Sequence, residues 1–186
     1  MNDTPIFATE RLVLRPLRAN DADALHAIYG DAAASIWSSH PPHAHVEETR
    51  ERIAQTIDDP DWRNWVITLK GDDAAIGTLG AYEKRQGKVI EIGYALVPAH
   101  WGRGIASEAV RALVTRLFAE GNRRVFADTD PENTASNRLL ERLGFAREGY
   151  LRGEWETHLG VRDSYIWGML ADEWEVRDEV EPRPSR

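Results

Sequence analysis

The chain has 186 residues, no cysteine and a formal net charge of −8, with 23 lysines and arginines against 31 aspartates and glutamates. This length suits one domain that buries about 70% of the surface of its unfolded chain. The lack of cysteine excludes disulfides, thiolate metal sites and a cysteine nucleophile. The acidic balance argues against nonspecific nucleic-acid binding and slightly favours a cationic partner.

No secretory pattern and no apolar run long enough to cross a membrane is found, so a cytoplasmic protein without membrane contact is expected. We expect one domain over residues 1–171. A flexible acidic tail is expected over 172–186, where six acids and three arginines gather.

Hydrophobic periodicity predicts the elements in chain order. The expected strands are 6–17, 65–69, 75–82, 89–96, 124–128, a strand after Phe145 and 163–170. The expected helices are 20–29, 46–57, 106–117 and 133–143. Because a helix joins strands 89–96 and 124–128, these two strands should run parallel, and a gap between them would admit an extended ligand arm.

Two glycines lie in the loop WGRGIA, residues 101–106, between a strand and a helix. The first N–H groups of a helix lack partners within it and carry the positive end of the helix dipole, so they attract anions. Gly102 and Gly104 bring no Cβ atoms that would hold a phosphate away, and they allow positive φ. The loop is therefore predicted to bind a pyrophosphate.

A G-x-G-x-x-G dinucleotide fingerprint is the alternative interpretation of this loop. Its third glycine would stand where the chain has Ser107, and its turn would follow the strand directly, without the residues from Pro98 to Trp101. Asp128 does lie at a suitable separation for a ribose contact. The fingerprint thus fits only in part.

The string EIGYALVPAHWGRGIASEA, residues 91–109, resembles the acetyl-CoA signature of the GNAT superfamily of N-acetyltransferases. The superfamily motif is Gln/Arg-x-x-Gly-x-Gly/Ala, and Trp101 replaces its first residue. With tryptophan at this position, the chain resembles the RimJ/RimL-like branch, which contains the ribosomal-protein N-terminal alanine acetyltransferases. TERLVLRPL at 9–17, NTASN at 133–137 and LGF at 143–145 agree, so the resemblance spans roughly residues 6–171.

This resemblance implies an α/β (α+β) fold, a single GNAT-like domain with a mixed central sheet splayed at the acetyl-CoA site and helices on both faces. It also implies acetyl-CoA as co-substrate, no metal, pantetheine bonded to the backbone near residues 96 and 97, and, by analogy alone, a homodimer. The implied cofactor-binding residues are Leu96, Val97, Trp101, Gly102, Arg103, Gly104, Ile105, Ala106, Asn133 and Ser136.

Acetyl transfer needs a neutral amine in the right geometry, oxyanion stabilisation and a proton for the leaving thiolate. An α-amine with a pKa of about 7.8 is roughly 10% neutral at pH 7, so a weak base suffices. Glu91 is the leading candidate, directly or through a water, and is also expected to contact the acceptor. It could instead only shape the pocket, and Glu154 and Glu156 are further candidate bases.

Many GNAT enzymes carry a tyrosine acid five residues before the phenylalanine of the Gly-Phe pair, a position that is Leu140 here. Leucine cannot donate a proton. The resembled branch has a serine that matches Ser136, whose hydroxyl can hydrogen-bond the departing sulfur. If Asn133 caps the helix, Ser136 could instead serve local capping. Asn133 would contact the cofactor arm or a bridging water.

The irregular stretch 35–45 is expected to border the acceptor pocket in the resembled family. Trp37 is either a wall of that pocket or an ordinary packed aromatic residue. His40, His43 and His45 invite a metal interpretation, but no carboxylate shares the cluster, and a polar turn held open by two prolines is favoured.

The sequence therefore predicts an N-acetyltransferase that moves an acetyl group from acetyl-CoA to a primary amine, by direct transfer in a ternary complex. The acceptor is a protein N-terminal α-amine or a small-molecule amine. A non-catalytic acyl-CoA-binding or sensing module of the same fold is the alternative, motivated by Leu140.

Overall fold

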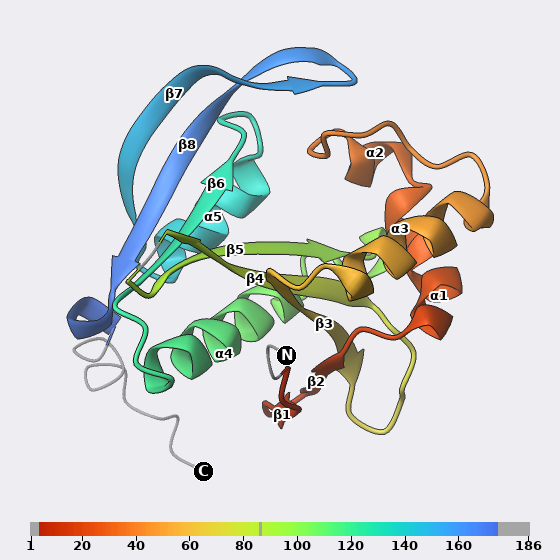
Figure 1. Ribbon diagram of the computed structural model, residues 1–186, viewed down its shortest axis with the longest axis horizontal. Coiled ribbons are helices and arrows are strands. Elements are labelled where there is room, and N and C mark those ends of the chain that lie inside the picture. Colours follow the sequence, from red (N-terminus) through yellow and green to blue (C-terminus); the bar gives the residue numbers. More distant parts are fainter. Residues whose placement is uncertain (1–3, 86, 175–186) are drawn as a thin grey trace.

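The computed structural model describes residues 4–85 and 87–174 of the chain (Figure 1). Its strands are β1 (Phe7–Ala8), β2 (Leu12–Pro16), β3 (Trp62–Leu69), β4 (Gly77–Arg85), β5 (Val89–Leu96), β6 (Arg124–Thr129), β7 (Ala146–Thr157) and β8 (Gly160–Leu170). Its helices are α1 (Ala22–Tyr29), α2 (Ala32–Ser35), α3 (Val46–Asp58), α4 (Ile105–Ala119) and α5 (Thr134–Arg142), with 3-10 turns at η1 (Ala19–Asp21) and η2 (Pro98–His100).

One mixed sheet of eight strands, in the order β1-β2-β3-β4-β5-β6-β8-β7, forms the centre of the molecule. Neighbouring strands are antiparallel except β5 and β6, which run parallel as predicted because α4 connects them (Figure 1). The long β7–β8 hairpin forms one edge of the sheet and extends beyond it (Figure 1).

Helices cover both faces of the sheet, as the resemblance implied (Figure 1). Side chains alternate across a strand, so neighbouring residues of β3 join different cores. Trp65 packs in the core that contains the apolar face of α4. Val66 packs in a second core with Leu25 of α1 and Ile53 of α3.

β5 and β6 pair over only three residues and then separate. The last paired residues are Glu91 and Phe126, although β5 continues to Leu96 and β6 to Thr129. A mixed sheet splayed between its two parallel strands was the expected fold, and the register confirms it. The separation leaves room between the strand ends.

The packed part of the chain extends past the expected boundary at residue 171. Trp174 is only 3% exposed, its indole donates a hydrogen bond to Thr115 Oγ1 of α4 at 3.1 Å, and its ring lies against Phe118. Burial of the apolar indole stabilises this contact. The acidic composition of the segment gave no indication of it. The rest of the predicted tail, residues 175–186, lies outside the described residues.

Candidate active site

The glycine loop has the backbone that the sequence predicts. Gly102 and Gly104 adopt φ values of +71° and +74°, which L residues rarely adopt, and Gly104 is the N-cap of α4. A glycine cap leaves the N-terminus of α4 without a capping side chain. The first-turn N–H groups, from Ile105 onward, are therefore available to an anion.

Arg11 and Glu108 connect this loop to the N-terminal segment. Glu108, in the first turn of α4, accepts hydrogen bonds from Thr9 Oγ1 at 2.5 Å and from Arg11 Nε at 2.6 Å. Arg11 in turn donates to the carbonyl of Arg103 at 3.1 Å. The guanidinium thus places a positive charge beside the loop and holds its backbone in position.

The end of β5 contributes backbone groups beside the loop. The Trp101 indole donates to the Leu96 carbonyl at 2.7 Å, so Trp101 fastens the loop to the strand while remaining 47% exposed. The Val97 N–H donates to Ile76 of the neighbouring segment at 2.9 Å, and the Val97 carbonyl accepts from His100. Because backbone groups alternate in direction along a strand, the Leu96 N–H faces the gap, and it is the group left for the predicted pantetheine contact.

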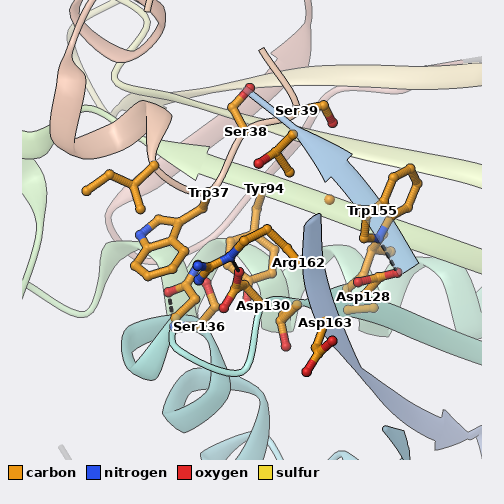
Figure 2. Close-up of a pocket in the computed structure, with 17 residues that line it drawn as sticks. Trp37, Ser38, Ser39, Tyr94, Asp128, Asp130, Ser136, Trp155, Arg162 and Asp163 are labelled. Carbon is orange, nitrogen blue, oxygen red and sulfur yellow. Dashed lines mark hydrogen bonds and ion pairs between the residues drawn. The ribbon is translucent and has the colours of Figure 1, made fainter. Parts of the chain in front are cut away.

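A cavity of about 280 Å³ opens where β5 and β6 separate (Figure 2). Residues from the segment after α2, from β5 and β6, from α5 and from the β7–β8 hairpin meet there. The lining side chains that carry polar groups or large rings include Trp37, Tyr94, Asp128, Asp130, Asn133, Ser136, Trp155, Arg162 and Asp163.

Three aspartates face an arginine in this cavity, so its formal charge is negative. Asp128 on β6 accepts from the Trp155 indole at 3.0 Å and from the Ser164 hydroxyl. Arg162 on β8 binds Asp130 at 2.7 Å, and this hydrogen bond raises the pKa of the arginine. For Asp163, the hydrogen bond from the Tyr150 hydroxyl lowers the carboxyl pKa.

Asn133 and Ser136 lie together at the start of α5, as the motif predicts. Asn133 is the N-cap, and its Oδ1 accepts from the Ser136 backbone N–H at 3.1 Å. That capping bond uses the serine backbone, so it leaves the Ser136 hydroxyl to line the cavity. Leu140, one turn further along α5, is fully buried in the core.

Glu91 is not among the residues that line the cavity. It is the last residue of β5 paired with β6, and its carboxylate lies 3.4 Å from Lys84 Nζ. Alternation along both strands places Glu91 and Asp128 on the same face of the sheet, opposite the face of Ile92 and Ala127. Glu91 therefore lies on the same face of the sheet as the cavity residue Asp128, without lining the cavity itself.

The remaining candidate acids lie on the exposed side of β7. Glu154 and Glu156 are exposed and do not line the cavity, although Trp155 between them does. Trp37 lines the cavity and remains 41% exposed, so it forms part of a wall that solvent and ligands can reach (Figure 2).

The histidines of the 35–45 stretch have structural contacts. The His43 ring accepts or donates a hydrogen bond at 2.9 Å with Thr49 and stacks on Tyr29, and His45 caps α3. Within residues 4–85 and 87–174, no three His, Asp or Glu side chains are grouped to hold a metal ion.

Sequence and structure comparisons identify the family. Residues 11–146 match the profile described as an acetyltransferase (GNAT) domain. The chain belongs to the GNAT acetyltransferase family. It is 35% identical over 172 residues to the uncharacterized N-acetyltransferase p20 of Bacillus licheniformis, covering 89% of this chain and 96% of the relative.

Solved structures of GNAT proteins agree. A probable GNAT acetyltransferase from Chromobacterium violaceum superposes with a TM-score of 0.86 at 30% identity, over 93% of this chain and 89% of its own. RimL, a ribosomal L7/L12 α-N-protein acetyltransferase in complex with coenzyme A, superposes with a TM-score of 0.79 at 24% identity, over 91% of this chain and 99% of its own. The protein is an N-acetyltransferase, and its family uses acetyl-CoA.

Sequence reasoning missed several residues of this GNAT cavity: Tyr94, Asp128 as a lining carboxylate, Trp155, Arg162 and Asp163. The Tyr94 position could have been recognised, because alternation along β5 places it on the same side as Ile92 and Leu96. The hairpin residues gave no such local signal. None of the described helices is both long and apolar enough to cross a membrane.

Proposed function

We propose that this enzyme is a RimJ/RimL-like N-acetyltransferase that moves an acetyl group from acetyl-CoA directly to a primary amine in a ternary complex. The observation that carries the proposal is the cavity at the separation of β5 and β6. It joins the hydroxyl-bearing start of α5 on one side to an acidic face on the other.

The cofactor side fits a phosphorylated thioester. The first N–H groups of α4, released by the Gly104 cap and flanked by Arg11, suit a pyrophosphate. The Leu96 N–H, which strand alternation directs into the gap, and the Asn133 side chain suit the amides of a pantetheine arm. Acetyl-CoA supplies the activated acyl group when bound, and the protein supplies its orientation.

The acceptor side fits an amine that is protonated before it reacts, or one that carries a second, positively charged group. Asp128, Asp130 and Asp163 outnumber Arg162, and the indoles of Trp37 and Trp155 offer faces to a cation. Both proposed acceptor classes, a protein N-terminal α-amine and a small cationic amine, meet this description. The structural similarity to RimL, a ribosomal L7/L12 α-N-protein acetyltransferase, supports including peptides in the search.

The reaction also needs a base for the amine proton and a group that stabilises the departing sulfur. Glu91 is our candidate base, acting through a water, since its carboxylate lies on the acceptor face without lining the cavity. Ser136 is our candidate contact to the departing sulfur, since its hydroxyl lines the cavity. The absence of cysteine supports direct transfer, because the chain has no thiol that could form a covalent thioester with the acyl group.

The test begins with calorimetric titration of the purified protein with acetyl-CoA, with free CoA and NAD as comparators. An acceptor screen follows, using peptide α-amines with different first residues and a set of polyamines, with thiol release and product mass as readouts. Turnover of any amine supports the proposal. Tight CoA binding without turnover would instead support the non-catalytic module, and preferential NAD binding would refute the loop assignment.

A further inference from the structure

Tyr94 is the one tyrosine among the residues that line the cavity. It lies on β5 between Ile92 and Leu96, whose side chains are buried in the core under α4. Its ring packs against the same core, and Tyr94 and Ser136 both line the cavity (Figure 2). The Ser136 side chain is near enough to the Tyr94 hydroxyl to influence its pKa. Two hydroxyl groups, from different elements, therefore meet at one place.

The Tyr94 hydroxyl lacks a partner for its hydrogen. Its oxygen is buried, yet within residues 4–85 and 87–174 it completes no hydrogen bond. A buried hydroxyl without a partner costs stability, so native proteins nearly always satisfy such groups. An unsatisfied donor in a residue that lines a cavity is available to an atom of a bound ligand.

We propose that Tyr94 is a catalytic residue. Its hydroxyl, together with that of Ser136, donates a hydrogen bond to the sulfur of the thioester as the carbon–sulfur bond breaks. This inference rests on the proposed function. It assigns to β5 the hydroxyl that Leu140 cannot supply from α5. The two donors approach the sulfur from different elements, so they stabilise the developing negative charge jointly.

Tyr94 acts as a hydrogen-bond donor and keeps its proton. Burial raises the pKa of Tyr94 to about 12, an effect that the nearby Ser136 side chain only partly offsets. A thiol has a pKa of about 8.5, so a thiolate is too weak a base to take that proton. The new carbon–nitrogen bond forms, the electron pair of the broken bond leaves with sulfur, and the amine proton passes to Glu91 or solvent, from which the thiolate is reprotonated.

The substitution Tyr94→Phe removes only the hydroxyl and tests the proposal. We expect kcat to fall by about tenfold to a hundredfold, the effect of one hydrogen bond to a charged group, while KM for acetyl-CoA changes little. The matched control is Tyr165→Phe, because the Tyr165 ring packs against the same core and does not line the cavity. That control should keep wild-type turnover.

A binding measurement tests the sulfur contact without turnover. Calorimetry compares free CoA with desulfo-CoA, which lacks the sulfur atom, at a pH near 9 where the thiol is largely ionised. The wild type and Tyr165→Phe should prefer CoA, and Tyr94→Phe should lose most of this preference. An unchanged preference in a folded Tyr94→Phe protein would overturn the proposal.

The two proposals fail separately. If the wild type acetylates no amine but Tyr94→Phe loses the preference for CoA over desulfo-CoA, the proposed function fails and the sulfur contact stands. If the wild type turns over and Tyr94→Phe matches it in kcat, the proposed function stands and the role of Tyr94 is refuted.

Discussion

The substitution Gly104→Ala probes the cofactor loop most directly. At φ +74° an alanine is strained by about 1–2 kcal/mol, which should lower the melting temperature by roughly 2–8 °C for a chain of this length. The new Cβ would lie 3.6 Å from Arg11 Nη2, an ordinary contact, so the protein should fold. The Cβ would instead stand where an anion approaches the start of α4.

The expected loss of cofactor affinity follows from the contacts that the Cβ would disturb. One charge-assisted hydrogen bond is worth about 1.5–3 kcal/mol, and 1.4 kcal/mol corresponds to tenfold in Kd. We therefore expect Gly104→Ala to weaken CoA binding at least about tenfold in calorimetric titration.

A second glycine separates strain from blocked binding. Gly71, in the turn after β3, has φ +85° and open space where an added Cβ would lie, so Gly71→Ala carries a similar strain far from the loop. It should lose similar stability and keep wild-type CoA affinity. Equal CoA affinity in folded Gly104→Ala and in the wild type would refute the assignment of the loop as the pyrophosphate site.

Three further predictions concern catalysis, acid stability and the C-terminal contact. Glu91→Gln should lower turnover about a hundredfold and remove the acidic limb of the pH profile while CoA affinity stays near wild type; an unaltered profile would exclude Glu91 as the base. The hydrogen bond from Arg124 lowers the pKa of Glu148, so this carboxylate stabilises the fold above the ordinary glutamate pKa of about 4.3, and the contribution is lost as the pH falls through its folded pKa. Urea unfolding between about pH 5 and 3 should therefore show a steeper loss of stability in the wild type than in Glu148→Gln, and parallel curves would contradict this reasoning. Trp174→Ala should cost about 3 kcal/mol in urea unfolding with kcat unchanged, because the indole is buried against α4 and lies away from the cavity; a loss below about 1 kcal/mol would show that the contact contributes little.

The parts of the site that the sequence predicts well depend on local backbone chemistry. Gly102 and Gly104 have positive φ, Asn133 caps α5, and the β5-loop-α4 unit begins and ends close to its predicted limits. Each depends on a few consecutive residues, since glycine tolerates a left-handed backbone and an asparagine oxygen accepts from a helix N–H three residues on. Such preferences are readable without knowledge of the rest of the chain.

The relations between distant segments depended on tertiary packing. Periodicity showed Glu91 beside the cofactor loop, but only the register of β5 and β6 shows that Asp128, rather than Glu91, lines the cavity. Likewise only the β7–β8 hairpin brings Trp155 to Asp128, 27 residues away in sequence. Charge patterning alone could not reveal that Trp174 packs onto α4.

The sequence by itself determined the fold family, the backbone of the glycine loop and the cap of α5, because glycine conformations, capping and hydrophobic alternation act within a few residues. The tertiary structure alone decided which side chains share the cavity and which buried hydroxyl of the described residues has no hydrogen-bond partner. Tyr94 illustrates the division: alternation along β5 predicts which way it points. Its unsatisfied hydroxyl beside Ser136 arises only when α5 packs next to the separated strands.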